Sequence, residues 1–125
     1  MKTRKQLKDE YKLMKPRMGV FAIRNKNSGK IYVARATNLD LVWNAEKFKL
    51  DSGGHPNRAL QNDWNESADG NFVFEVLHEL KPSDNPEADA RAELIALEEM
   101  TIEDIQPFGE KGYNRSQRGT KLLSD

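Results

Sequence analysis

Two short apolar segments, Gly19-Val20-Phe21 and Ile31-Tyr32-Val33, flank the stretch Asn25-Lys26-Asn27-Ser28-Gly29-Lys30. Asn, Ser and Gly favour tight turns, and β-branched or aromatic runs on either side of such a turn are typical of a β-hairpin. We therefore expect one strand over residues 18–24 and a second over residues 30–35. Each strand carries one aromatic side chain.

The rest of the chain alternates between helical and strand patterns. Apolar spacing and Pro, Gly or capping residues predict helices over residues 3–15, 37–50, 56–66 and 87–105, and a third strand over residues 71–77. This order predicts an α+β domain, a small three-stranded antiparallel sheet flanked by helices. We expect a helical N-terminal extension over residues 1–17, one domain over residues 18–114 and a flexible tail over residues 115–125.

Length and composition exclude several classes of protein. A chain of 125 residues is the usual size of one domain. It contains no cysteine, which excludes disulfides, thiolate catalysis and Cys-based zinc sites and favours a reducing compartment. Its apolar runs are too short to cross a bilayer, and its first residues are too charged for a secretory signal. We expect a cytoplasmic protein without a membrane partner.

The charges are unevenly distributed although the net charge is zero. Residues 1–50 hold 13 basic and 4 acidic side chains, whereas residues 51–107 hold 3 basic and 14 acidic ones. Two interpretations stay open. The basic half, with a net charge of +9, meets phosphates while the acidic half faces away, or the two halves of one domain attract each other.

The helix expected over residues 87–105 carries an acidic residue on its core-facing side. At 100° per residue, Glu98 lies in the middle of the arc formed by Leu94, Ile95, Leu97, Thr101, Ile102 and Ile105. A carboxylate at such a position costs free energy unless a cation, a metal ion or hydrogen bonds accompany it. Glu98 is therefore either paired with an Arg or Lys at a gap in the core, or a metal ligand at the edge of a cleft.

Three further segments share their pattern with one nuclease family. Glu98 lies nine residues before Pro107, His55 lies five residues before Leu60-Gln61, and the domain closes with Gly112-Tyr113-Asn114. With the hairpin, these segments resemble the catalytic domain of the GIY-YIG nucleases, closest in pattern to the phage homing endonuclease branch. The resemblance covers residues 18–114 and implies DNA as a partner and one Mg²⁺ as a cofactor.

The resemblance implies roles for residues that keep their types. It makes Tyr32 the base or water-orienting group, Glu98 the ligand of one Mg²⁺, and Asn114 and His55 supporting residues. On spacing alone, His55 is either an ordinary residue before a helix or an acid–base group of the cleft.

Other family positions have changed. Phe21 stands at the first-motif tyrosine, so ring packing is retained but the hydroxyl is lost, and Ala34 replaces the second-motif glycine. The resemblance implies that the arginine that clamps the scissile phosphate should stand at the position of Val42, or near it at that of Ala45. Neither of these side chains can bind phosphate. Loss of such a bidentate donor commonly lowers the rate on the order of a hundredfold or more. The catalytic motif is therefore degenerate.

Nearby cations are candidates to contact DNA in place of this arginine. Arg35 follows the second motif, and Lys47 and Lys49 lie on the next helix, although a lysine lacks the guanidinium fork. With Lys30 in the hairpin, they form the expected substrate-binding set. Glu46, on the same helix, either pairs with a base or repels phosphate.

We interpret the chain as a GIY-YIG-like domain that acts on or binds DNA, with weakened or lost phosphodiester cleavage. The alternative is a noncatalytic protein or nucleic-acid interaction module that retains only the fold. If the domain cleaves, the resemblance and the nearby cations imply Mg²⁺-dependent hydrolysis with metal bound at Glu98 and the catalytic set Tyr32, His55, Glu98, Asn114 and Arg35.

Overall fold

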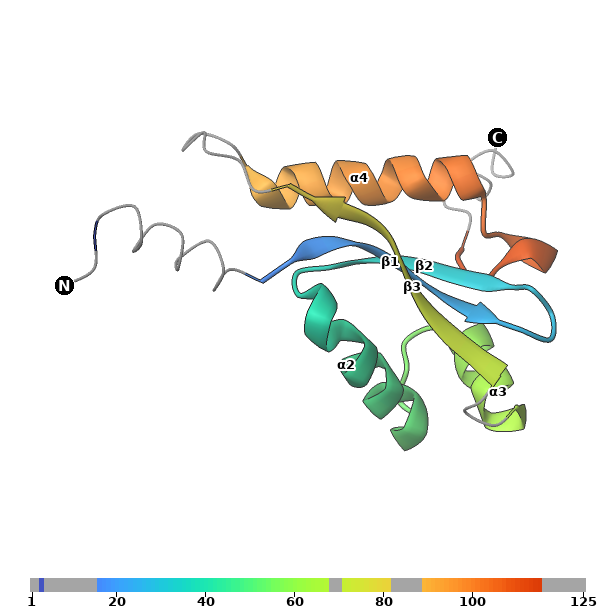
Figure 1. The fold of residues 1–125 in the computed structure, drawn as a ribbon. Helices are drawn as coiled ribbons and strands as arrows, with labels where there is room; N and C mark the ends of the chain where they lie inside the picture. The colour runs from blue at the N-terminus through green and yellow to red at the C-terminus, as the bar shows by residue number, and fades with distance from the viewer. Residues whose placement is uncertain (1–2, 4–15, 68–70, 82–88, 116–125) are drawn as a thin grey trace.

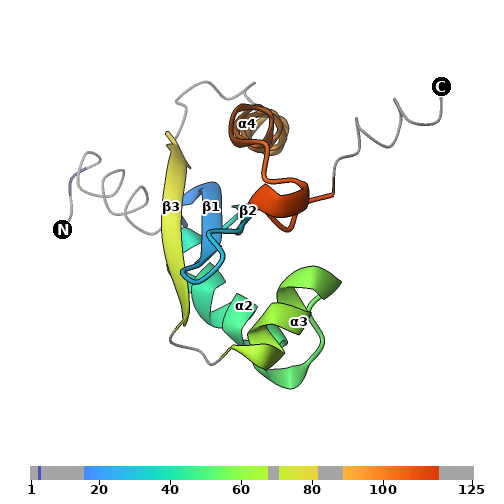
Figure 2. The same cartoon turned by 90° about the vertical axis from the view of Figure 1, so that its right-hand side faces the viewer.

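The computed structural model describes residues 3, 16–67, 71–81 and 89–115 of the chain. Three antiparallel strands form one sheet in the order β2-β1-β3, and helices pack on both of its faces (Figure 1, Figure 2). This confirms the predicted α+β architecture. The elements in chain order are β1 (Met18–Asn25), β2 (Ile31–Ala36), α2 (Leu39–Ser52), α3 (Arg58–Glu66), β3 (Phe72–Leu80), α4 (Ala90–Ile105) and the short 3₁₀ helix η2 (Gly109–Lys111).

The hairpin of β1 and β2 forms where the turn residues predict it. Asn25 Oδ1 accepts the main-chain N–H of Asn27 at 2.9 Å, an Asx-type turn that Asn favours. Gly29 has a φ of 78°, a left-handed conformation that glycine adopts without a steric penalty. The resulting register pairs Ile23 with Tyr32.

Side chains at the helix ends set the bounds of α2 and α3. Asn38 caps α2 by accepting the N–H of Asp40, and Gly53 ends α2 with a φ of 80°, so the helix lies two residues later at each end than the predicted range 37–50. The prediction that α3 begins at Pro56 is wrong, because Asn57 Oδ1 accepts the N–H of Leu60 at 3.0 Å. Asn57 is therefore the N-cap and the helix begins two residues later.

The third strand is longer than predicted. It extends to Leu80 and includes His78, because pairing with β1 continues on the far side of a bulge between Val20 and Phe21. Helix α4 begins after the cap residue Asp89. Residues 82–88 and 116–125, and all but Thr3 of the expected helix over residues 3–15, lie outside the described part of the chain. Among the described helices, none combines the length and apolar character that a membrane crossing requires.

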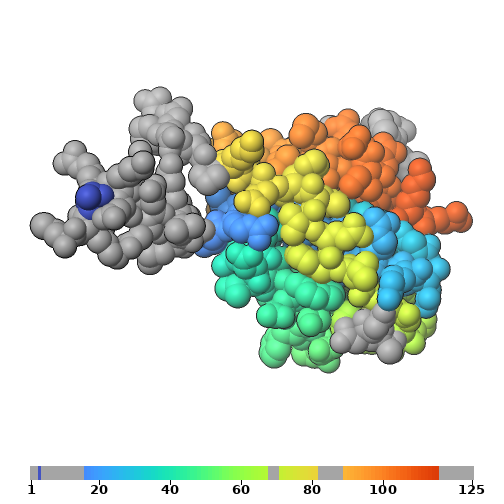
Figure 3. Space-filling view, viewed as in Figure 1, coloured from blue at the N-terminus to red at the C-terminus, as the bar shows by residue number. Residues whose placement is uncertain are grey.

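The sheet separates two apolar clusters. Tyr32 and Ala34 of β2 pack into the cluster that α2 and α3 share with Phe21, whereas Ile31 and Val33 pack toward α4. This alternation follows from the two-residue period of a strand. Figure 3 shows the side of the molecule along which β3 runs, with α4 above it and α2 below it. The two faces of β2 therefore lead to different surroundings, and its outer edge lies between them.

Candidate functional site

The outer edge of β2 is paired by residues distant in sequence. The main-chain O of Ile31 accepts the N–H of Tyr113 at 3.0 Å. The side chain of Asn114 bonds both main-chain groups of Val33, accepting from the N–H at 2.9 Å and donating to the O at 2.7 Å. Because unpaired groups on an edge strand are costly when shielded from water, these contacts stabilise the fold.

Close main-chain approach explains the glycine of the closing segment. A Cβ on Gly112 would lie 2.3 Å from the O of Pro107 and 2.5 Å from the O of Ile31. Neither main-chain oxygen can rotate away from the added Cβ as the end of a flexible side chain could. Gly112 therefore allows the segment after η2 to lie against β2, as Figure 2 shows.

Glu98 reaches the same edge from α4. Its Oε2 accepts the main-chain N–H of Arg35 at 2.8 Å, and its Oε1 accepts Arg35 Nη1 at 2.8 Å. The Glu98 side chain is 17% exposed, in keeping with its expected position on the core-facing arc. The structure therefore brings Glu98 to Arg35 and Asn114 to Val33 at the edge of β2, the strand that also carries Tyr32, and it pairs Glu98 with an arginine.

Tyr32 projects from β2 toward α2 and α3. Its ring contacts Phe21 edge-on at 6.3 Å between centroids and His55 edge-on at 5.4 Å. Burial, followed by the charges of Glu46 and Glu98, raises the pKa of Tyr32 to about 12. The phenol is therefore neutral near pH 7, where it can orient a water molecule by hydrogen bonding but is a very weak base.

His55 is buried and both of its ring nitrogens have partners. Nδ1 accepts the main-chain N–H of Asn57 at 3.0 Å, so the ring proton lies on Nε2, which donates to Glu46 Oε1 at 3.1 Å. Glu46 also accepts from Lys49 at 3.1 Å. Burial alone would raise the pKa of Glu46, but the hydrogen bonds from His55 and Lys49 outweigh burial and lower it. In this arrangement neither nitrogen of His55 is available to a metal ion or a substrate.

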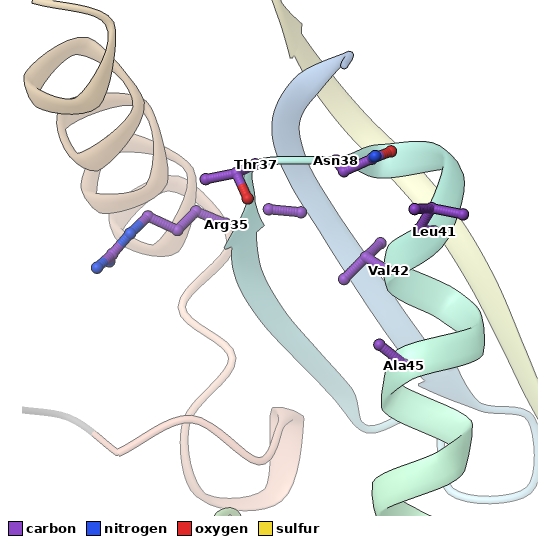
Figure 4. Close-up of a pocket in the computed structure, with 7 residues that line it drawn as sticks. Arg35, Thr37, Asn38, Leu41, Val42 and Ala45 are labelled. Carbon is purple, nitrogen blue, oxygen red and sulfur yellow. The ribbon is translucent and has the colours of Figure 1, made fainter.

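A groove of about 360 Å³ lies beside the C-terminal end of β2 (Figure 4). Val42 and Ala45, the two positions at which the resemblance implies an arginine, form part of its wall from α2. Arg35 extends from β2 toward α4 and away from these two residues, so it does not fill the missing arginine's position. The lining residues are Arg35, Ala36, Thr37, Asn38, Leu41, Val42 and Ala45.

The other expected substrate-binding residues have partners of several kinds. Lys30 lies over the ring of Tyr113 at 5.8 Å from its centroid, and Lys47 lies over the ring of Trp43 at 5.3 Å. Lys49 pairs with Glu46. Of the four cations, only Lys30 and Lys47 lack a carboxylate partner within the described ranges.

Ion pairs join the basic and acidic parts of the chain. Arg17, Arg24 and Arg35 pair with acidic residues far along the sequence, at distances of 2.7 to 2.9 Å. This arrangement agrees with the interpretation in which the two halves attract each other. The pairs are Arg17–Glu79, Arg24–Glu75 and Arg35–Glu98.

A polar network that the sequence does not reveal holds the closing segment in place. Tyr113 donates its hydroxyl to Asp63 Oδ2 at 2.7 Å and accepts from Asn25 Nδ2 at 3.0 Å. Asn57 Nδ2 donates to the main-chain O of Tyr113 at 2.7 Å. Burial, then the hydrogen bond to Asp63, raises the pKa of Tyr113 to about 12. The only signal in the sequence was the closing motif itself, because spacing does not indicate which distant side chains meet the tyrosine.

The residues present do not fit a bound Mg²⁺ in this arrangement. Mg²⁺ bonds oxygen atoms at about 2.0–2.1 Å and commonly uses one or two carboxylates with water. No cluster of three or more His, Cys, Asp or Glu side chains that could hold a metal occurs among the described residues. Glu98 would therefore be the only one of these side chains to bind the ion, and water molecules would supply the other ligands. Both of its oxygens accept hydrogen bonds from Arg35, whose guanidinium would repel a divalent cation.

The fold can be compared with known proteins. The chain has the fold of a GIY-YIG nuclease catalytic domain, as predicted. The structure of the catalytic domain of the homing endonuclease I-TevI matches with a TM-score of 0.65 and 23% sequence identity, covering 80% of this chain and 99% of that domain. A substituted form of the same domain matches with a TM-score of 0.65 and 22% identity over 78% of this chain and 92% of that one. No protein-family model and no curated protein matches the sequence.

Proposed function

We propose that this chain is a DNA-binding domain with a GIY-YIG nuclease fold in which phosphodiester cleavage is weakened or lost. One observation carries the second part of the proposal. Glu98, the residue to which the family resemblance gives a metal, has both oxygens bonded to Arg35. The apolar residues Val42 and Ala45 in the groove and the neutral phenol of Tyr32 agree with it. Among the described residues that line the groove, the only arginine is Arg35, which is paired with Glu98.

The fold supports DNA as the partner, because the matching domain belongs to a homing endonuclease. Of the four expected cations, Lys30 in the hairpin and Lys47 on α2 are the most available to phosphates, since the described contact of each is with an aromatic ring and not with a carboxylate. A cation–π contact is weak at an exposed site and leaves the ammonium hydrated on its other side. Lys49 and Arg35 would first have to leave Glu46 and Glu98.

A salt titration of DNA binding tests this proposal. Affinity for a fluorescent duplex should fall as salt rises, with a slope of about 0.9 for each phosphate contact. Changing Lys30→Ser together with Lys47→Ser should lower the slope by about 2 and weaken binding at low salt about tenfold or more. The matched control, Lys81→Ser with Arg91→Ser, removes the same charge from exposed positions in the acidic half and should change affinity less than threefold.

Equal losses in the two double variants would show that net charge alone governs binding, against the proposed site. No binding by the native protein at low salt would contradict the proposed function.

One observation favours the alternative, a noncatalytic protein-interaction module. Leu41 and Phe48 on α2 are 61% and 73% exposed, and with Ala45 they form a stripe at helical spacing on one side of the helix. Exposed apolar patches can mark protein-interaction surfaces. Leu41→Ser with Phe48→Ser should leave DNA affinity within twofold under the proposed function, and absence of native DNA binding would favour the alternative.

A further inference from the structure

Arg35 satisfies both oxygens of Glu98 by itself. Its main-chain N–H and its Nη1 each donate at 2.8 Å, one to each oxygen. The side chain of Arg35 is 42% exposed and that of Glu98 is 17% exposed, so the guanidinium is the more solvent-accessible member of the pair. The main-chain contact fixes the carboxylate at the edge of β2, and the side-chain contact neutralises its charge.

We infer that Arg35 is the resident cation of this site and that its guanidinium prevents a divalent cation from binding Glu98. The cation is part of the chain, so its local concentration at Glu98 does not depend on the metal content of the solution. This inference deepens the proposed function, whose loss of cleavage rests on the same contact between Arg35 and Glu98, and it concerns the protein without DNA.

Charge accounts for the exclusion. A divalent cation bonded to Glu98 would lie within a few ångströms of the guanidinium, and like charges repel strongly in a partly buried setting. Glu46 and Glu98 both act on the phenol of Tyr32, and Lys49 and His55 are bonded to Glu46. Without the Arg35 side chain, Glu98 would retain its main-chain hydrogen bond and one oxygen free to bind a metal.

Titration with Mn²⁺ alone tests this inference through paramagnetic broadening of backbone amide NMR signals. In the native protein, Mn²⁺ should not selectively broaden the amides of residues 33–36 and 97–99. In Arg35→Ala, the same amides should broaden at Mn²⁺ concentrations at least tenfold lower, and added Mg²⁺ should reverse the effect. Adding Glu98→Gln to Arg35→Ala should abolish the gain, because the amide oxygen is a weaker metal ligand than a carboxylate.

The control variant is Arg24→Ala, which frees the carboxylate of Glu75 from a similar ion pair of 2.7 Å. It should gain no selective broadening near Glu98. Amide chemical shifts of each variant report whether it is folded, and Arg35→Gln serves in place of Arg35→Ala if the latter unfolds. Two results would overturn the inference: Glu98-dependent broadening of the native protein at the concentration that suffices for Arg35→Ala, or no gain in a folded Arg35 variant. Neither result depends on DNA binding.

Discussion

The outer edge of β2 and the groove beside its C-terminal end differ in what their side chains do. At the edge, Asn114 and Glu98 bond main-chain groups of β2. In the groove, Val42 and Ala45 present apolar atoms where the family resemblance implies an arginine. The edge contacts made by Asn114 and Glu98 are present, whereas at Val42 and Ala45 the groove has no side chain that could bind a phosphate.

The largest effect on stability should come from Gly112→Ala at the edge. Its Cβ would meet two main-chain oxygens at 2.3 and 2.5 Å, so the closing segment would have to move. We expect a loss of about 3 kcal/mol or more in the free energy of unfolding, the upper end for overpacking. The control Gly54→Ala, whose nearest new contact is 3.8 Å away, should change it by less than about 0.5 kcal/mol. If Gly112→Ala and Gly54→Ala gave the same urea denaturation curve, the closing segment would not be closely packed against the edge of β2.

Asn114→Ala should have the next largest effect. It removes two hydrogen bonds and leaves both main-chain groups of Val33 without their partner. The expected loss is about 2 kcal/mol, measured by urea denaturation. Asn44→Ala, on the exposed side of α2, is the control and should be neutral. A similar result for the two variants would indicate that water replaces Asn114 at the edge.

Tyr32 gives a pH-dependent effect. Its pKa of about 12 in the folded state exceeds its usual value of 10.0, so the folded state retains the phenolic proton longer than the unfolded state. The resulting stability is fully present below pH 10 and is lost as the pH rises to about 12, by roughly 3 kcal/mol at most. The ultraviolet absorbance of native protein minus that of Tyr32→Phe should titrate near pH 12. A midpoint near pH 10 would contradict the burial of this phenol and the influence of the charges of Glu46 and Glu98 on it.

The smallest effect should come from Arg24→Ala. Arg24 and Glu75 are 40% and 38% exposed, and pairs at this exposure contribute about 0.5 kcal/mol or less. Arg35→Ala should cost about 1 kcal/mol, because Glu98 is less exposed and loses a charged donor. Thermal or urea denaturation compares the two. Equal losses would mean that the Arg35–Glu98 pair is energetically an ordinary surface pair.

The sequence predicts the features that depend on local chemistry. The turn residues Asn25 and Gly29 locate the hairpin, Asn38 and Gly53 bound α2, and periodicity places Glu98 on the inward side of α4. Competition between adjacent capping signals is harder to judge, so the start of α3 was predicted at Pro56 although Asn57 caps the helix.

The partners of the candidate site residues were beyond prediction. Periodicity shows that Glu98 needs a counter-charge but does not identify Arg35, which is 63 residues away. It likewise does not reveal that His55 donates to Glu46. Such pairings depend on how the loops bring the helices and strands together. The periodicity of apolar residues does not predict that arrangement.

Cleavage of a supercoiled plasmid in the presence of Mg²⁺ or Mn²⁺ tests most directly whether the structural contacts remain while the chemistry is lost. Native protein and Glu98→Gln should be compared at equal concentration, because glutamine retains an oxygen that can accept the N–H of Arg35. Both proteins should show the same background level of nicking. Robust cleavage by the native protein that Glu98→Gln abolishes would contradict this expectation and would show that Glu98 exchanges Arg35 for a metal ion during the reaction.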